Sequence, residues 1–187
     1  GALGSRFVNA GDAEQNMVAA AAGLSKSGLR PWLYSTAPFL YARALEQIRN
    51  DLALPNVPSV LVGNGGGYGY GVMGSTHHAL EDYGVLLTLP NMQVLIPAFD
   101  SDVGAWVGSL MDSAGPTFLR LGLAEQPNWL QPPPFAAWRR LYSSSQGPTI
   151  AIAGPLAGGI VDAIRSSNVV ADVWLVSRLP LEPPPAE

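Results

Sequence analysis

Residues 11–28 read G-D-A-E-Q-N-M-V-A-A-A-A-G-L-S-K-S-G, and the expected strands and helices lie on both sides of this stretch. A polar start followed by an apolar run predicts a helix that begins near Asp12, because aspartate is a favoured N-cap and Gln15 completes a capping-box pattern. Gly28 supplies the stop signal. Glu14 then lies in the first turn, where the helix dipole favours a carboxylate even without a catalytic role.

Strand and helix patterns alternate on both sides of this helix. Residues 6–9 are expected to end a strand that leads into it, and residues 64–71 are a glycine-rich loop that allows positive φ or a close backbone approach. This alternation predicts a parallel, doubly wound α/β sheet with right-handed crossovers. The other expected strands are 31–35, 58–62, 93–97 and 116–121, and the expected helical segments are 39–54, 77–86 and 100–111.

The composition changes after residue 123. Residues 124–147 are rich in proline and serine, which is typical of an interdomain linker. Residues 149–154 and 171–176 have buried-strand patterns and flank a helical pattern, so residues 148–187 are expected to be part of a second α/β domain. Residues 1–123 form the first domain in this division of the chain.

Charge and composition exclude several classes of partner and site. The net charge is −4 and the ten basic residues do not cluster, so neither nucleic acid nor an anionic membrane surface is an expected partner. The absence of cysteine excludes disulfides and thiolate metal sites. The sequence shows no secretory signal and no apolar run long enough to span a bilayer, so we expect a cytoplasmic location.

Four blocks in the chain point to one family. They are R-F-V-N-A-G-D-A-E-Q-N-M at 6–17, F-L-Y-A-R-A-L-E-Q-I-R-N-D at 39–51, G-S-T-H-H-A-L-E-D at 74–82 and L-P-N-M-Q-V-L-I-P-A at 89–98. In this order they resemble the transketolase family of thiamine-diphosphate enzymes. The similarity covers the pyrimidine-binding domain over roughly 6–123 and continues, more weakly, into the start of the C-terminal domain.

The resemblance implies roles for several residues around the cofactor. In that family a buried glutamate hydrogen-bonds N1′ of the cofactor's aminopyrimidine and so activates it, and Glu14 stands in this place. Burial would raise the pKa of this carboxyl and the helix N-terminus would lower it, so the sequence leaves the direction open. Phe39 is the candidate for stacking on the pyrimidine, with Tyr41 as a substitute, although both also fit ordinary core packing. Arg43 is a further candidate cofactor contact.

The resemblance also bears on the substrate. His77 falls on a histidine that faces the substrate in the family and moves protons at the donor carbonyl, whereas His78 is expected to be structural. Val72 and Met73 replace a polar group that reads a donor hydroxyl, and Leu123 stands where an arginine often grips a phosphate. Met73 and Arg120 are therefore candidate substrate contacts, and the substrate is expected to be a carbonyl compound other than a standard sugar phosphate.

The family's diphosphate-binding motif, G-D-G…N, does not occur in these 187 residues. The resemblance therefore implies that a partner subunit holds the diphosphate and its Mg²⁺, as in the C-terminal subunit of a split transketolase-like enzyme, and that the assembly is a heterotetramer. It also implies that the pyrimidine domain would begin with a further helix and strand before residue 6, and that the terminal proline run marks a cut.

Two alternatives remain open. The β subunit of a 2-oxoacid dehydrogenase E1 component shares the A-E-Q helix and a comparable histidine loop, but the R-N-D and L-P-N-M blocks favour the transketolase side. A noncatalytic scaffold or regulatory relative would also explain why the polar substrate-reading residues have been lost.

Overall fold

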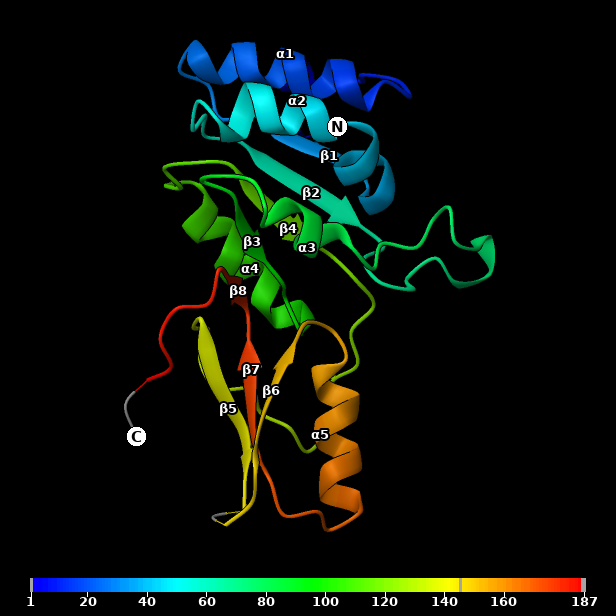
Figure 1. The fold of residues 1–187 in the computed structure, drawn as a ribbon, viewed down its shortest axis with the longest axis vertical. Helices are drawn as coiled ribbons and strands as arrows, with labels where there is room; N and C mark the ends of the chain where they lie inside the picture. Colours follow the sequence, from blue (N-terminus) through cyan, green and yellow to red (C-terminus); the bar gives the residue numbers. More distant parts are fainter. Residues whose placement is uncertain (1, 145, 186–187) are drawn as a thin grey trace.

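The computed structural model describes residues 2–144 and 146–185. Its centre is a five-stranded sheet in the order β1-β2-β4-β3-β8 (Figure 1). The first four strands run parallel and β8 adds an antiparallel edge. The strands are β1 (Trp32–Thr36), β2 (Val60–Asn64), β3 (Gln93–Leu95), β4 (Thr117–Arg120) and β8 (Arg178–Leu179).

Helices cover both faces of this sheet. Leu61 and Phe118 belong to a core shared with α1, α3 and the helical segment after β1, while Val60 and Leu119 pack with Trp106 of α4 on the other face. Successive strand residues thus point to opposite apolar layers, which confirms the predicted doubly wound parallel sheet. The helices are α1 (Glu14–Lys26), η2 (Phe39–Arg43), α2 (Leu45–Gln47), η3 (Ile48–Ala53), α3 (Asp82–Leu86) and α4 (Asp100–Leu110).

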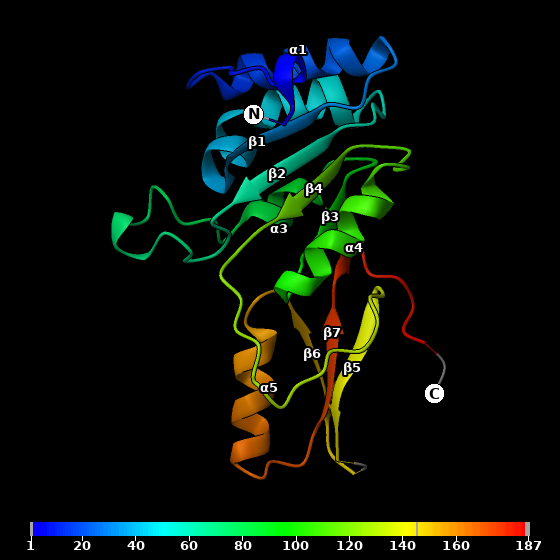
Figure 2. The same ribbon diagram turned by 180° about the vertical axis from the view of Figure 1, so that it is seen from behind.

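A smaller α/β unit follows the first sheet. Its strands have the order β5-β7-β6, with β6 parallel and β5 antiparallel to β7, and α5 packs beside them (Figure 2). The chain passes from β7 through Ser177 directly into β8, so one segment belongs to both sheets. The elements are β5 (Trp138–Ser143), β6 (Thr149–Ala153), α5 (Ala157–Ser166) and β7 (Asp172–Val176).

The expected linker of residues 124–147 contains strand β5, which the proline and serine content concealed. Arg139 and Leu141 face inward and are buried, while Arg140 is exposed between them. An inward-facing arginine does not look like a core residue in a sequence, so the period-two pattern does not stand out. Ser145, Ala186 and Glu187, which fall in the linker and the terminal run, lie outside the described residues.

Two predictions at the N-terminal end are wrong. Residues 6–9 form no strand, because the first sheet ends at β1 and offers them no ladder, and Phe7 and Val8 are 66% and 76% exposed. Asp12 does not cap α1: the helix begins at Glu14, its N-cap is Ala13, and no side chain caps it. Gly11, at φ +69°, turns the chain before the helix and donates to Asn9 Oδ1 instead.

The helical segment 39–54 exists as predicted but is not one regular α-helix. η2 and η3 are π-helical turns on either side of the short α2. π-helical turns are frequent at functional sites. Here η2 carries both Phe39 and Arg43.

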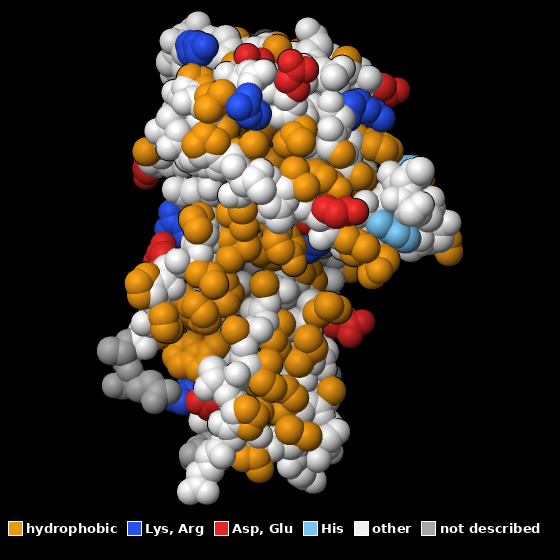
Figure 3. Space-filling model, viewed as in Figure 1, with side chains coloured by type: hydrophobic (Ala, Val, Ile, Leu, Met, Phe, Trp, Pro, Cys, Tyr) orange, Lys and Arg blue, Asp and Glu red, His pale blue; other side chains and the backbone are white. Residues whose placement is uncertain are grey.

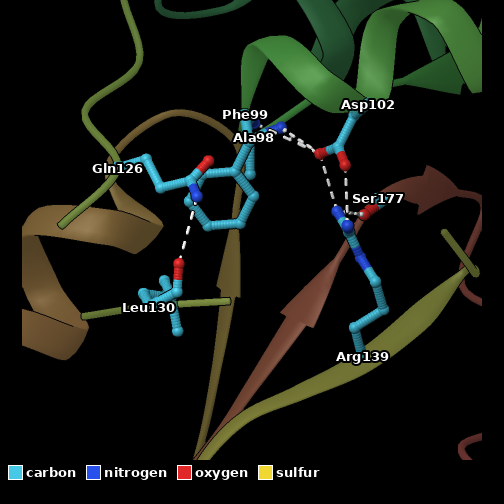
Figure 4. Close-up of polar contacts among 7 residues, drawn as sticks. All are labelled: Ala98, Phe99, Asp102, Gln126, Leu130, Arg139 and Ser177. Carbon is cyan, nitrogen blue, oxygen red and sulfur yellow. Dashed lines mark hydrogen bonds and ion pairs between the residues drawn. The ribbon is translucent and has the colours of Figure 1, made fainter. Parts of the chain in front are cut away.

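A buried ion pair joins the two units (Figure 4). Arg139 of β5 donates from both terminal nitrogens to Asp102 of α4 at 2.7 Å, and one of them also reaches Ser177 Oγ at 3.3 Å. The same carboxylate accepts the backbone N–H groups of Ala98 and Phe99 at 3.1 Å, so Asp102 also caps the start of α4. In the described part of the chain, no helix is long and apolar enough to cross a membrane.

Candidate functional site

Glu14 lies at the carboxyl end of the parallel sheet, where α1 begins beside the end of β1. Its side chain is only 8% exposed. Ser35, near the end of β1, donates to Oε1 at 2.9 Å, and Arg43 donates to Oε2 at 2.6 Å. Ligands of open α/β sheets bind at this edge, so the carboxylate is placed where a binding site is expected.

The pKa of Glu14 is set by opposing effects. Burial, which is the largest single effect, raises the pKa, but the hydrogen bond from Arg43 lowers it, as do its own backbone N–H and the Ser35 hydroxyl. The pKa is lower than the ordinary value of 4.5 as a net result. In the free chain Glu14 is therefore an ionised carboxylate at neutral pH.

Aromatic rings surround the Glu14–Arg43 pair. The guanidinium of Arg43 lies over the Phe39 ring at 4.6 Å from its centroid, within the range of a cation–π contact. The His77 ring meets Phe39 edge to face with centroids 5.1 Å apart, and Tyr70 meets His77 at 6.1 Å. Glu14, Phe39, Arg43 and His77, which are all candidate site residues, are thus brought together from three separate segments.

The loop between β2 and α3 carries His77 and projects from the molecule at the right of Figure 1. Asn64 donates to the Tyr70 hydroxyl at 3.0 Å, and Thr76 Oγ1 lies 3.0 Å from His77 Nδ1. Gly65 has φ +74°, and a Cβ there would lie 2.1 Å from the Tyr70 ring. The glycine-rich sequence therefore lets this loop fold closely onto Tyr70.

Arg120, which was predicted as a substrate contact, lies inside the protein. It is 8% exposed, donates from Nε to Asp82 at 2.6 Å and from a terminal nitrogen to the Ala79 carbonyl at 2.9 Å. Gly66 makes room for it, since a Cβ there would lie 2.7 Å from the guanidinium. Arg120 thus anchors the base of the loop from inside the protein, and its donors face the chain.

Two other candidates lie away from Glu14. Tyr41 is buried in the core and donates to Glu81 at 2.9 Å, and burial followed by this hydrogen bond raises its pKa to about 12. This position fits core packing better than stacking on a cofactor. Met73 is 53% exposed at the tip of the projecting loop, in η4 (Gly71–Met73), beside Val72, which is fully exposed.

His78 contacts its own loop. Its Nε2 lies 2.9 Å from the Gly71 carbonyl and its ring meets Tyr68 at 4.9 Å. Figure 3 shows histidine at the surface of the projecting loop, with hydrophobic side chains beside it. These contacts agree with the structural role expected for His78.

Three residues that shape the site were not predicted from the sequence: Ser35, Tyr70 and Asp82. Ser35 stands in an S-T pair. In the corresponding segment of the family, only the aromatic residues suggest a cofactor contact. Tyr70 is one of two tyrosines in a glycine loop, and nothing local distinguishes it. Asp82 lies within one of the family's motifs, but its partner Arg120 is 38 residues away.

Known proteins share both the sequence blocks and the geometry of this chain. The family model described as transketolase, pyrimidine binding domain, matches residues 4–125. The chain belongs to the transketolase family. A subunit of apulose-4-phosphate transketolase from Phocaeicola vulgatus is 38% identical over 126 residues, which is 67% of this chain and 40% of that protein. A 1-deoxy-D-xylulose-5-phosphate synthase of Desulfotalea psychrophila is 34% identical over 115 residues, 62% of this chain and 18% of that enzyme.

Solved transketolases share the fold. A structure titled split gene transketolase, inactive beta4 tetramer, superimposes with a TM-score of 0.76 at 30% identity, over 92% of this chain and 58% of that one. The transketolase of Leishmania mexicana gives 0.75 at 22% identity, over 89% of this chain and 26% of that one, which shows the fold alone. The chain spans about 40% of the length of the first apulose-4-phosphate transketolase relatives.

Proposed function

We propose that this chain supplies the pyrimidine half of the active site of a thiamine-diphosphate-dependent enzyme that transfers a two-carbon ketol or acyl unit between carbonyl compounds. The observation that carries the proposal is the buried Glu14 carboxylate at the carboxyl end of the sheet, with Phe39 and His77 beside it. Family membership makes thiamine diphosphate the cofactor for which such a carboxylate is suited.

The residues present fit the pyrimidine end of that cofactor. Glu14 would hydrogen-bond N1′ of the ring, and Phe39 would offer the aromatic face on which the ring rests. His77, linked to Phe39 through its ring edge, would move a proton at the substrate carbonyl. When bound, the cofactor supplies the carbon nucleophile that adds to a carbonyl carbon, and the chain's own residues bind, orient and exchange protons.

We propose that another polypeptide binds the diphosphate end. The G-D-G…N motif is absent from the 187 residues, and the relatives whose names describe a transketolase subunit or a split gene transketolase support an enzyme made of separate chains. We therefore place the diphosphate, its Mg²⁺ and their ligands on a partner subunit in a cytoplasmic heterotetramer, with the cofactor at the interface between the two chains.

The proposed substrate class rests on residues that face solvent in the free chain. Val72 and Met73 offer apolar surface on the loop that carries His77, and Leu123 is 81% exposed. These residues provide no charge for a phosphate group, so we propose a donor or acceptor without one, either a less polar carbonyl compound or a 2-oxoacid. Transfer of a ketol unit from xylulose 5-phosphate at ordinary transketolase rates by the assembled enzyme would contradict this assignment.

Two other functions are less well supported. The relatives named above are transketolase and deoxyxylulose-phosphate synthase proteins, which favours the transketolase side over a 2-oxoacid dehydrogenase E1 component. A noncatalytic scaffold would have no need to keep a buried carboxylate hydrogen-bonded beside an aromatic ring and a histidine.

Replacing Glu14 by Ala tests the proposal, with Asp12→Ala as a matched control. Asp12 is an exposed acid two residues away that caps nothing. In the complex with the partner subunit, Glu14→Ala should abolish nearly all turnover while size-exclusion chromatography shows intact assembly, and Asp12→Ala should behave like the wild type. Full activity of Glu14→Ala would identify the chain as a scaffold.

A further inference from the structure

Arg43 lies between the two groups that would bind the pyrimidine ring. Its guanidinium donates to Glu14 Oε2 at 2.6 Å and covers the Phe39 ring at 4.6 Å. The Arg43 side chain is 44% exposed and that of Glu14 only 8%, so the arginine is on the solvent side of the pair. In the free chain the carboxylate is therefore covered by a side chain that can move.

The guanidinium shares two properties with an aminopyrimidine ring: both are planar, and both stack on aromatic faces. The guanidinium presents N–H donors in its own plane to a carboxylate. The ring nitrogen of an aminopyrimidine instead shares a proton with the same carboxyl group while the ring stacks on the same face. Both groups need the Phe39 face and a Glu14 oxygen, and one ring face cannot hold two planar groups at once.

We propose that Arg43 occupies the place of the cofactor's pyrimidine ring in the free chain and must swing away before the cofactor can bind. This inference rests on the proposed function. It gives Arg43 a role opposite to the direct cofactor contact predicted from the sequence: the arginine competes with the cofactor.

The arginine protects a site that another chain completes. A buried carboxylate without a partner is unfavourable, so the free subunit needs a cation beside Glu14 until the cofactor arrives. The Arg43 hydrogen bond is the largest of the effects that lower the pKa of Glu14, whereas sharing a proton with N1′ is favoured by a higher pKa. When Arg43 leaves, this lowering effect is lost and the raising effect of burial remains.

The size of the effect depends on how fully Arg43 is engaged. Apparent affinity is reduced by the fraction of molecules in the competent state, so a contact formed in about 90% of molecules weakens cofactor binding about tenfold. The contact is partly exposed, which keeps it weak enough for the cofactor to displace.

Calorimetric titration of the assembled complex with thiamine diphosphate and Mg²⁺ tests the proposal. Arg43→Ala should lower the dissociation constant about tenfold, by removing the competitor. Arg43→Lys, which keeps the charge but cannot stack as a plane, should lie between Arg43→Ala and the wild type. Arg49→Ala is the matched control, because Arg49 is an exposed arginine six residues further along that donates to neighbouring Asn50, and its loss should leave the constant unchanged.

The possible results distinguish competition by Arg43 from the proposed function. A dissociation constant that rises or stays the same in Arg43→Ala would overturn the competition and restore Arg43 as a contact or a bystander. A lower constant in Arg49→Ala as well would overturn it too, because the effect would then be one of general charge. Failure of the wild-type complex to bind thiamine diphosphate at all would overturn the proposed function itself, and with it this inference.

Discussion

At the level of single residues, the candidate site is built around the buried carboxylate of Glu14. Glu14 receives one hydrogen bond from a strand residue, Ser35, and one from a helical residue, Arg43. The Ser35 hydrogen bond can remain when Arg43 leaves, and it orients the carboxylate for a meeting with a ring nitrogen. The catalytic proposal for Glu14 therefore depends on residues that are not themselves catalytic.

Ser35 is a positioning residue whose removal should be measurable. Ser35→Ala in the assembled enzyme should lower kcat about tenfold with KM unchanged, because one hydrogen bond to a charged group contributes roughly 1.5 kcal/mol. Ser35→Thr keeps the hydroxyl and should restore most of the rate. If Ser35→Thr is as slow as Ser35→Ala, the hydroxyl is not the operative group.

The free chain should show a matching dependence of stability on pH. In the folded chain the pKa of Glu14 lies below 4.5. The stabilising contribution of the ionised carboxylate to the free energy of unfolding is therefore complete above about pH 4.5 and is lost as the pH falls through the lowered pKa. Urea unfolding between pH 7 and pH 3 should show wild type and Glu14→Gln converging below about pH 4.5. A constant difference between them across the range would contradict the assigned ionisation.

At the scale of elements, the site depends on a projecting loop with a rigid base. Asp82, at the start of α3, and Arg120, at the end of β4, form a buried ion pair behind the loop. The pKa of Asp82 is raised by burial, which the charge of Arg120 only partly offsets. The pair therefore ties a strand end to a helix start, and Arg120 also holds the base of the loop through the Ala79 carbonyl.

Removing Arg120 should destabilise the protein more than a surface change. Arg120→Ala leaves Asp82 buried without its cation, and breaking such a pair costs about 3–5 kcal/mol of the free energy of unfolding. Adding Asp82→Ala should recover part of this loss, since the unpaired charge is then gone. Urea denaturation measures both, and a loss below about 1 kcal/mol for Arg120→Ala would place the pair among weak surface contacts.

Features that depend on a local sequence pattern could be predicted, and features that depend on long-range contacts could not. β2 and β4 could be predicted because a strand buried on both faces of a parallel sheet is a nearly continuous apolar run. Val60, Leu61 and Phe118 are buried members of these runs. Glu14, Phe39 and His77 were found because each lies in a contiguous motif. Ser35 was missed because its partner is 21 residues away. The prediction of a strand at residues 6–9 was wrong for the same reason, because strand propensity does not show whether a neighbouring strand is present to pair with.

At the scale of the whole molecule, the two α/β units are joined by buried charge as well as by chain. Asp102 and Arg139 are 3% and 2% exposed in their side chains, and Ser177 of the segment between β7 and β8 contributes to the same network. The pair fixes β5 against the start of α4, which sets the second unit relative to the first sheet.

Arg139→Ala should therefore lower stability by about 3–5 kcal/mol, because Asp102 loses its cation while buried. Arg140→Ala is the matched control on the same strand: Arg140 pairs with Asp172 at the exposed face and should contribute less than about 1 kcal/mol. Urea unfolding followed by tryptophan fluorescence distinguishes them. Equal losses in the two variants would show that the interface does not depend on the buried pair.

We propose that this chain holds half of a cofactor site and that a second chain completes it. Calorimetric titration with thiamine diphosphate and Mg²⁺, performed on the chain alone and on its complex with the partner subunit, tests this most directly. We predict no tight binding by the chain alone and magnesium-dependent binding by the complex that is lost in Glu14→Ala. Tight, magnesium-dependent binding by this chain alone would contradict the account.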